Sequence, residues 1–230
     1  MSARNIIGQQ SLVGVQPIIN NNHFTFVKIL EDNWESIYDE LVEILKYKDL
    51  IPSFHEISKE QYKISKGKKW KTFAFFSFGH KFKHNCSYAP NTVKLLECIP
   101  GLQSAWFSVI APGYHVPKHK GITRGILRSH LGLSIPNNPK ECFMDVGNDR
   151  IYWEQGKVVV FDDSFEHEVW NNTDQERIVL LFDFDRPMKK IGCYIHDTSM
   201  KIFRRTAAYK EGVRSTIELE KLFNRKVPIR

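Results

Sequence analysis

Five short stretches of the sequence alternate apolar and polar residues or run almost entirely apolar, and turn-forming residues separate them. A half-buried strand shows a period of two because successive side chains point to opposite faces of the sheet. Pairs such as Pro-Gly and Asn-Asn supply the turns between the stretches. The stretches lie at 70–78, 104–113, 126–136, 157–163 and 176–184. Their spacing predicts antiparallel strands that form a barrel or jelly roll.

Helices are expected to flank this β core. The segment "DNWESIYDELVEILKYKD" at 32–49 repeats apolar residues at helical spacing, with Asp32 or Asn33 as its N-cap. The segment "PNTVKLLECIPG" opens with Pro90, which suits a first helical turn. A chain of 230 residues, 42% of them hydrophobic and 13% aromatic, is sufficient for one domain with a β-rich interior. The fold class expected is therefore mainly β with flanking helices.

Charge is concentrated at the C-terminal end of the chain. Residues 198–230 hold nine Lys and Arg against three Asp and Glu, so the remaining residues carry only +1 of the formal net charge of +7. Aromatic residues lie in strand patterns and not among exposed basic ones, which argues against nucleic acid as a partner. The basic tail would suit an acidic peptide or an anionic membrane surface, although such charge runs are usually solvated surface.

The sequence contains no stretch of about 18 apolar residues that could span a membrane, and its first residues do not resemble a cleaved signal peptide. Its four cysteines show no CxxC spacing and are expected to be reduced. We therefore expect a soluble cytoplasmic protein, with peripheral binding to a membrane surface as an alternative.

The stretch "ILRSHLGLSI" at 126–135 places charged groups on one face of a strand. Leu127, Leu131, Leu133 and Ile135 share one face, whereas Arg128 and His130 share the other. Arg177 stands in another apolar stretch, where a buried guanidinium requires an anion. These cationic or protonatable groups suggest a carboxylate-bearing ligand inside the barrel. The structural alternative is an internal partner for Arg177, for which the candidates are Asp162, Asp163 and Asp183.

Two further histidines are candidate metal ligands. His119 lies at a turn before the strand at 126–136, and His167 follows the strand at 157–163 after a short loop. A single histidine is more often structural, but histidines on two strands of one small barrel can converge, and such a pair suits Fe(II) with open coordination positions. His115 also lies nearby, but Pro117 argues against a helix that would align it with His119, so we expect His115 at the surface or behind the ligands.

Four segments resemble the aspartyl/asparaginyl β-hydroxylase family, including its lipid A hydroxylase-like relatives, in order and in spacing. They are "FSVIAPGYHVPKHKG", "LRSHLGLSIP", "WEQGKVVVFDDSFEHEVWNN" and "RIVLLFDFDRP". Members of this family are Fe(II)- and 2-oxoglutarate-dependent dioxygenases on a double-stranded β-helix, a jelly roll of cupin-like form. The resemblance extends over roughly 23–188. It implies an N-terminal extension at 1–22, a dioxygenase domain at 23–190 and a basic, partly helical tail at 191–230.

The resemblance also assigns roles to individual residues. It implies that His119 and His167 bind iron, that Arg177 with Ser108 holds the distal carboxylate of 2-oxoglutarate, and that Arg128 with His130 lies at its metal-proximal end. Many related oxygenases have a carboxylate two residues after the first iron histidine, where this chain has Gly121. The implied reaction consumes O2 and 2-oxoglutarate, releases succinate and CO2, and hydroxylates an unactivated C–H bond. Both histidines must be deprotonated to bind iron, so activity should fall below a pH of about 6.5.

The substrate stays open between several classes. The first expectation is the β-carbon of an Asp or Asn residue in a peptide or protein, or a related amino-acid substrate. A lipid acyl chain, as in lipid A hydroxylases, is an alternative because the "DFDRPM" ending resembles those relatives. Gly121 could also leave room for chloride on iron, as in a halogenase. A barrel that binds an oxo acid without catalysis is the non-enzymatic alternative.

Overall fold

The computed structural model describes residues 3–228, except for the side chains of residues 3, 4, 59 and 61. Its strands are β1 Ile18–Ile19, β2 Trp70–Ser77, β3 His80–Lys81, β4 Leu102–Ile110, β5 Tyr114–His119, β6 Ile126–Ser134, β7 Cys142–Val146, β8 Asp149–Tyr152, β9 Val158–Phe161, β10 His167–Asn171 and β11 Arg177–Asp185. They form a seven-stranded sheet in the order β1-β9-β6-β11-β4-β2-β3 and a four-stranded sheet in the order β5-β10-β7-β8. Neighbouring strands in both sheets are antiparallel.

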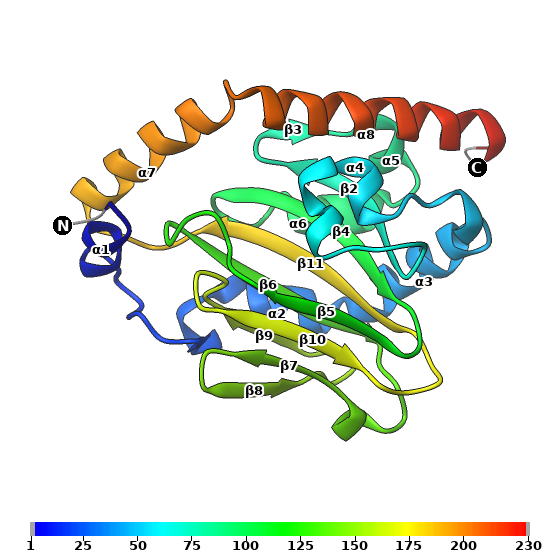
Figure 1. Ribbon diagram of the computed structural model, residues 1–230, viewed down its shortest axis with the longest axis horizontal. Helices are drawn as coiled ribbons and strands as arrows, with labels where there is room; N and C mark the ends of the chain where they lie inside the picture. Colours follow the sequence, from blue (N-terminus) through cyan, green and yellow to red (C-terminus); the bar gives the residue numbers. More distant parts are fainter. Residues whose placement is uncertain (1–2, 229–230) are drawn as a thin grey trace.

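The strands from β4 to β11 form a double-stranded β-helix. Strands β4, β6, β9 and β11 lie in the large sheet, and β5, β7, β8 and β10 lie in the small one. The chain crosses repeatedly from one sheet to the other, so the two sheets face each other as the walls of a jelly roll (Figure 1). The expected fold class, mainly β with a double-stranded β-helix core, is therefore confirmed.

The five predicted strands all lie in the large sheet, as β2, β4, β6, β9 and β11. The sequence analysis did not predict the four strands of the small sheet. These strands have only four to six residues each, and β5 contains a proline and two histidines instead of a run of apolar residues.

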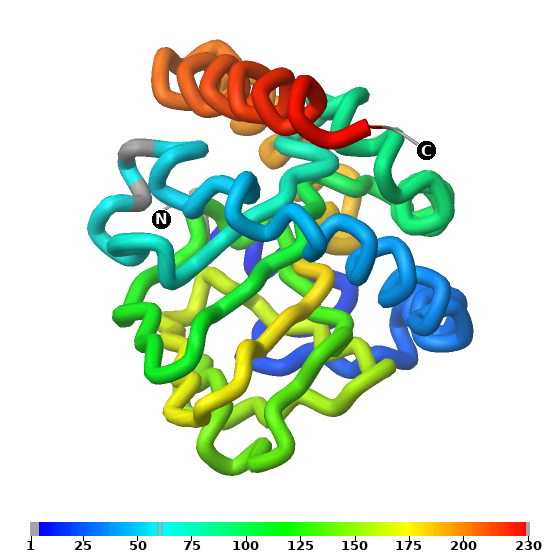
Figure 2. The backbone as a smooth tube through the Cα atoms, turned by 90° about the vertical axis from the view of Figure 1, so that its right-hand side faces the viewer, coloured from blue at the N-terminus to red at the C-terminus, as the bar shows by residue number. Residues whose placement is uncertain are grey.

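Helices cover the other face of the large sheet and one end of the barrel. The described helices are α1 Ala3–Gln9, α2 Thr25–Asp32, α3 Trp34–Leu45, α4 Phe54–Ile57, α5 Lys83–Ser87, α6 Pro90–Leu96, α7 Lys190–Phe203 and α8 Ala207–Lys226, with 3-10 turns at Asn21–His23, Lys48–Leu50, Lys59–Lys63 and Pro139–Glu141. The two helices predicted around 32–49 and 90–101 are confirmed as α3 and α6. In Figures 1 and 2, α8 lies across the top of the barrel.

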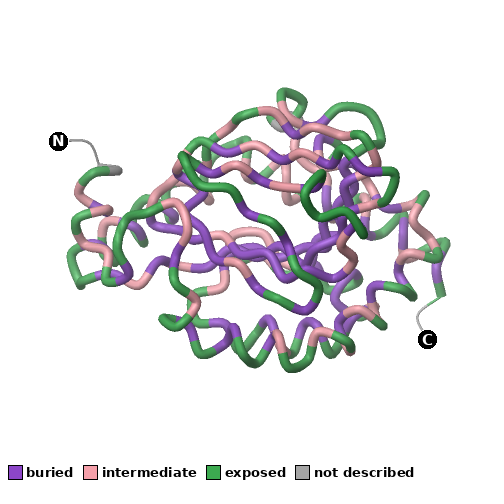
Figure 3. Tube along the Cα trace, turned by 90° about the horizontal axis from the view of Figure 1, so that it is seen from below, coloured by how far each residue is buried: buried purple, intermediate pink, exposed green. Residues whose placement is uncertain are grey.

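The two faces of β6 contact different hydrophobic clusters, as its alternation predicts. Leu127, Leu131 and Leu133 pack in the cluster that lies between the large sheet and the N-terminal helices. Arg128 and His130 point to the interior between the two sheets. Ile135 differs from the prediction because it lies beyond the end of β6 and packs against the cluster between the sheets. Buried residues gather along the strands in the middle of the molecule (Figure 3).

Segments outside the jelly roll also contact it. Strand β1 pairs with β9, and α8 contacts α4 and α5. The division of the chain at residues 22 and 190 stays a prediction. Among the described residues, no helix combines the length and the apolar character needed to cross a membrane.

Candidate active site

Two histidines meet where the small sheet faces the interior. His119 is the last residue of β5 and His167 is the first residue of β10, and they lie opposite each other in the antiparallel register. Their ring centroids are 4.1 Å apart. His119 therefore belongs to a strand, not to the turn predicted before β6. The pairing that the sequence suggested is present in the structure.

Backbone contacts orient both imidazole rings in the same way. Nδ1 of His119 donates to the carbonyl of Pro117 at 2.8 Å, and Nδ1 of His167 donates to the carbonyl of Phe165 at 3.0 Å. Each ring therefore keeps Nε2 as an unprotonated acceptor, which is the form that binds a metal. Burial lowers the pKa of both rings, and burial together with His119 lowers the pKa of His167 to about 3. Both rings are thus neutral at physiological pH.

The position that holds a carboxylate in many related oxygenases faces another carboxylate here. A Cβ atom on Gly121 would lie 2.2 Å from Oδ1 and 2.3 Å from Cγ of Asp163. The backbone N–H of Gly121 also donates to the carbonyl of Asp163 at 2.7 Å. A side chain at 121 would therefore have to displace the carboxylate of Asp163, which occupies the space beside this glycine.

The described residues contain no cluster of three His, Cys, Asp or Glu side chains with the geometry of a metal site. The donor set that His119 and His167 offer is two neutral imidazoles, which suits Fe(II) with positions left for small ligands. The fit to a metal thus rests on the free Nε2 atoms of this pair.

Arg128 has an internal partner. Its Nε donates to Oδ1 of Asp183 at 2.7 Å and its Nη2 donates to Oδ2 at 3.0 Å, while Oδ2 of Asp163 lies 3.5 Å from Nη2. Burial disfavours the charged form, but the two carboxylates outweigh it and raise the pKa of Arg128. Asp183 was a candidate partner for Arg177 and pairs with Arg128 instead. A ligand carboxylate that binds Arg128 would therefore share this guanidinium with Asp183 and Asp163.

Arg177 has no such partner in the part of the chain that the structure describes. The residue is 1% exposed, and its Nε and Nη1 have no hydrogen-bond partner among the described residues. Of the other two candidate partners, Asp162 pairs with Arg186 and Asp163 lies beside Arg128. Burial lowers the pKa of Arg177 to about 10, so it is still charged at neutral pH. A buried cation without an anion is costly, and this one fits the carboxylate of a bound ligand.

Trp153 connects Arg177 to His130. Its ring lies 4.6 Å from the guanidinium carbon of Arg177, and its Nε1–H donates to Nδ1 of His130 at 3.2 Å. This bond leaves the proton of the neutral ring on Nε2, which is buried and has no partner among the described residues. Burial, with Arg177 and Arg128, lowers the pKa of His130 well below its usual value. His130 is therefore a neutral donor, and sequence reasoning assigned no role to Trp153.

Ser108 lies on β4 opposite Val179 of β11, two residues from Arg177. Its Oγ accepts a hydrogen bond from Nε1 of Trp70 at 3.0 Å, which leaves its own hydroxyl proton available. His115 lies apart from this group: it stacks on Trp170 and its Nε2 is 2.7 Å from Oε2 of Glu168. The exclusion of His115 from the candidate ligands agrees with this geometry.

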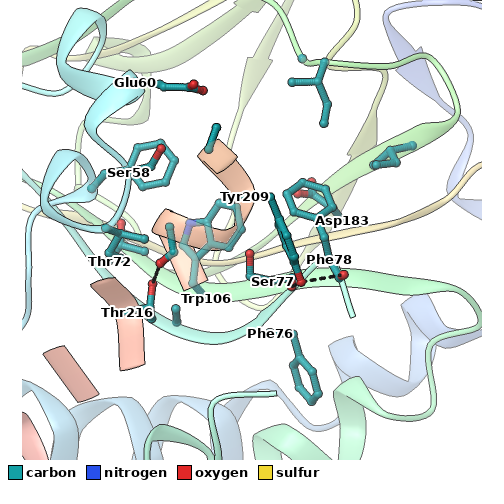
Figure 4. A pocket seen from close by; sticks show the side chains of 18 of the residues that line it. Ser58, Glu60, Thr72, Phe76, Ser77, Phe78, Trp106, Asp183, Tyr209 and Thr216 are labelled. Atoms are coloured by element: carbon teal, nitrogen blue, oxygen red, sulfur yellow. Dashed lines mark hydrogen bonds between the residues drawn. The ribbon is translucent and has the colours of Figure 1, made fainter. Parts of the chain in front are cut away.

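A cavity of about 220 Å³ begins beside His119, Gly121, Arg128 and Asp163 and extends beneath α8. Most of the side chains along it are aromatic or aliphatic; among them are Phe54, Trp70, Phe82, Trp106, Phe203 and Tyr209. Figure 4 shows Trp106 in the middle of the lining, with Thr72 and Thr216 to one side and Tyr209 and Asp183 to the other. Sequence reasoning missed this groove because its walls come from β2, α4 and α8.

The sequence profile described as aspartyl/asparaginyl β-hydroxylase matches residues 31–187, which is well over half of the chain. The chain belongs to this family. The family resemblance drawn from the four motifs is thereby confirmed.

The relatives of this β-hydroxylase family member include enzymes named for different substrates. An ornithine lipid ester-linked acyl 2-hydroxylase from Rhizobium tropici is 36% identical over 211 residues, which cover 92% of this chain and 75% of that protein. The human aspartyl/asparaginyl β-hydroxylase is 38% identical over 167 residues, which cover 70% of this chain and 21% of that protein. A solved prolyl-4-hydroxylase from Pseudomonas putida is 17% identical with a TM-score of 0.43 and covers 70% of this chain and 99% of that one. The family, together with the Rhizobium tropici and human relatives, identifies the chain as a hydroxylase.

The buried histidines of this hydroxylase make its folding sensitive to acid. The pKa values of His130 and His167 are lower in the folded state than the value of about 6.5 expected when unfolded. Below that pH the unfolded chain binds protons that the folded chain does not, so the free energy of unfolding falls by up to about 1.4 kcal/mol per pH unit for each ring. Denaturant titrations of the metal-free protein at pH 7.5 and 5.5 should show this loss. His167→Gln should reduce the slope of the free energy of unfolding against pH. An unchanged slope in that variant would contradict the assignment.

Proposed function

We propose that the chain is an Fe(II)- and 2-oxoglutarate-dependent dioxygenase that hydroxylates the acyl chain of a lipid. The observation that carries the cofactor assignment is the buried Arg177, which lacks a carboxylate partner among the described residues. It lies in the same barrel interior as two imidazoles with free Nε2 atoms. A dianionic oxo acid supplies the missing anion and a group that chelates a metal.

Each residue of the site has a defined task in this proposal. His119 and His167 hold the iron through Nε2, and the carbonyls of Pro117 and Phe165 fix the direction of their rings. Arg177 binds the distal carboxylate with the hydroxyl of Ser108, and His130 donates its Nε2–H to the same ligand. Arg128 lies at the metal-proximal end, held in place by Asp183.

When bound, the iron and the cosubstrate supply an oxidant that takes hydrogen from an unactivated C–H bond. One O2 and one 2-oxoglutarate give succinate, CO2 and a hydroxylated product. The apolar walls of the interior exclude water from this chemistry. They include Phe161 and Leu181, which lie within the cluster between the sheets.

Hydroxylation is supported over halogenation by the surroundings of Gly121. Chloride on the metal at that side would lie close to the carboxylate of Asp163, which fills the space beside Gly121. Two anions in so buried a place repel each other strongly. A binding protein without catalysis is the weaker alternative, because all six predicted site residues are present and the family consists of hydroxylases.

The lipid substrate rests on two observations. The groove beside His119 is lined mainly by aromatic and aliphatic side chains, which suit a hydrocarbon chain better than a charged side chain. The lipid acyl hydroxylase from Rhizobium tropici also matches 92% of this chain, against 70% for the human enzyme. These observations reverse the order expected from the sequence, in which an Asp or Asn residue came first. The 38% identity to the human enzyme keeps that substrate as the second candidate.

Coupled turnover tests the substrate. The protein loaded with Fe(II) and 2-oxoglutarate is given, in parallel, detergent-dispersed acyl-ester lipids and a peptide that contains Asp and Asn. Succinate should rise well above its substrate-free rate only with the lipid, in equal amount to a lipid product heavier by one oxygen atom. Stoichiometric oxygenation of the peptide, with the lipid inert, would favour the second candidate and overturn the first.

A further inference from the structure

The C-terminal helix α8 forms one wall of the groove that leads from the candidate metal centre. Ala208, Gly212 and Thr216 recur every four residues and line the groove together with Tyr209 and Val213. Residues four apart lie on the same face of a helix. The face that α8 turns to the groove is thus made largely of small side chains, and it leaves space between the helix and the large sheet.

This wall is fixed to the barrel at both ends of the helix. Just before α8, Nε of Arg204 donates to the carbonyl of Phe78 at 2.7 Å, and in the first turn of α8 the hydroxyl of Tyr209 donates to the same carbonyl at 3.3 Å. Near the other end, Oε2 of Glu220 accepts from the backbone N–H of His84 at 3.1 Å, and Phe223 packs in the core. Helix α8 is therefore a built-in part of the groove, whose width it determines.

The wall lies outside the segment that defines the family. The profile match ends at residue 187, before α7 begins. The match to the lipid acyl hydroxylase covers 211 of the 230 residues, so it leaves out about 19. The chain has 43 residues after residue 187, which is more than the match can leave out. It must therefore reach at least residue 211, through α7 and into α8. Sequence shared with a lipid hydroxylase thus continues into the wall of the groove.

Two polar groups in the groove have no hydrogen-bond partner within the described part of the chain. Nε1 of Trp106 and Oγ1 of Thr72 are buried, line the groove and make no hydrogen bond with any described residue. Trp106 is 8% exposed and Thr72 is 1% exposed. Unpartnered donors are costly in an apolar cavity unless a ligand brings an acceptor. An acyl chain attached through an ester or amide link brings both a hydrocarbon tail and a carbonyl oxygen.

We propose that the groove between α8 and the large sheet is an acyl-chain site in which the small-residue face of α8 selects chain length and Trp106 and Thr72 donate to the carbonyl of the chain. This inference rests on the proposed lipid substrate. It adds that residues beyond the family segment decide which acyl chains reach the metal. A bulky side chain on the groove face of α8 should shorten the chains that fit.

The test places a phenylalanine at Gly212. A Cβ there meets only the carbonyl oxygen of Ile57, at 3.7 Å, so the backbone accepts a side chain and its bulk would enter the groove. Gly212→Phe should weaken the binding of a fluorescent long-chain fatty acyl ester to the metal-free protein at least about tenfold, because each buried methylene contributes roughly fourfold to affinity. Octanoyl esters should bind nearly as before, and Gly212→Ala should have a smaller effect than Gly212→Phe.

Glu218→Phe, on the exposed side of α8, is the matched control for the added ring and should leave binding unchanged.

Thermal unfolding shows whether Gly212→Phe has merely unfolded the protein. In that event Val213→Ala, which widens the groove, should extend hydroxylation to bulkier chains, and Trp106→Phe should weaken binding of an ester more than of the matching alkane. If the wild type oxygenates lipids and folded Gly212→Phe accepts the same range of chain lengths, this inference alone is overturned. If the wild type oxygenates no lipid, the proposed function is overturned.

Discussion

Replacing Arg177 by methionine is expected to weaken cosubstrate binding strongly while leaving the fold as stable as before, or more stable. Methionine fills a similar volume without a charge, and among the described residues Arg177 has no anionic partner that the change would leave unpaired. Removing a buried uncompensated charge should raise the free energy of unfolding by about 1–4 kcal/mol. Loss of a buried charge-paired hydrogen bond to the ligand costs about 2–5 kcal/mol, so the affinity for 2-oxoglutarate should fall about 30-fold to several thousandfold. Calorimetric titration with 2-oxoglutarate and denaturant unfolding measure the two effects separately.

Arg150→Met is the matched control for this change. Arg150 is 45% exposed in its side chain and pairs with Asp145 at the surface. Such a pair contributes at most about 1 kcal/mol, so this variant should alter neither stability nor cosubstrate affinity appreciably. If Arg177→Met instead unfolds the protein, as loss of an internal ion pair would, then Arg177 has a structural partner and its assignment to the cosubstrate is wrong.

Gly121→Ala is expected to lower both the stability and the activity of the protein. The new Cβ would lie 2.2 Å from Oδ1 of Asp163, closer than atoms in real proteins approach, so the carboxylate of Asp163 must move. Overpacking of this kind costs about 1–3 kcal/mol, and activity should fall further because Asp163 also lies against Arg128. Urea unfolding and succinate release measure the two losses.

The double variant Gly121→Ala, Asp163→Gly distinguishes this clash from other causes. Removing the carboxylate removes the obstruction, so most of the lost stability should return even though activity does not. Gly212→Ala serves as a control for stability, since its Cβ has only an ordinary contact and alanine favours a helix by about 1 kcal/mol over glycine. Additive losses in the double variant would show that Asp163 does not fill the space beside Gly121.

The sequence was sufficient to predict five of the seven strands of the large sheet but none of the small sheet. Strands such as β4 and β11 have nine residues each, most of them buried, so their apolar runs are long enough to recognise. Strand β5 reads "YHVPKH", and one of its six residues is a metal-ligand candidate. A strand with candidate site residues on one face and charged residues on the other lacks the alternation of apolar and polar residues by which strands are recognised.

The part of the site that could be predicted is the one where a buried charge requires an anion. Arg177 stands out because its apolar neighbours predict that the charge is buried, and the structure leaves it without an anion. The pairing of Arg128 with Asp183 was not predictable, because the two residues are 55 positions apart and meet only through the register of β6 and β11. The space beside Gly121 likewise depends on a loop that approaches from elsewhere in the chain.

The groove wall was not predictable for a different reason. Ala208, Gly212 and Thr216 are small residues within the basic tail, and the importance of their shared face becomes clear only when α8 forms one wall of the groove. The sequence pattern shows which face of a helix has small side chains, whereas tertiary packing decides what that face contacts.

Anaerobic titration of the metal-free protein with Fe(II) and 2-oxoglutarate tests the central claim most directly. Chelation of an oxo acid to Fe(II) gives a weak visible charge-transfer band, which should form in the wild type and in His84→Ala, a change of an exposed histidine. The band should be lost in His119→Ala and should require far more cosubstrate in Arg177→Met. Absence of the band from folded wild-type protein that has bound iron would contradict the two-histidine cosubstrate site, and with it the dioxygenase mechanism.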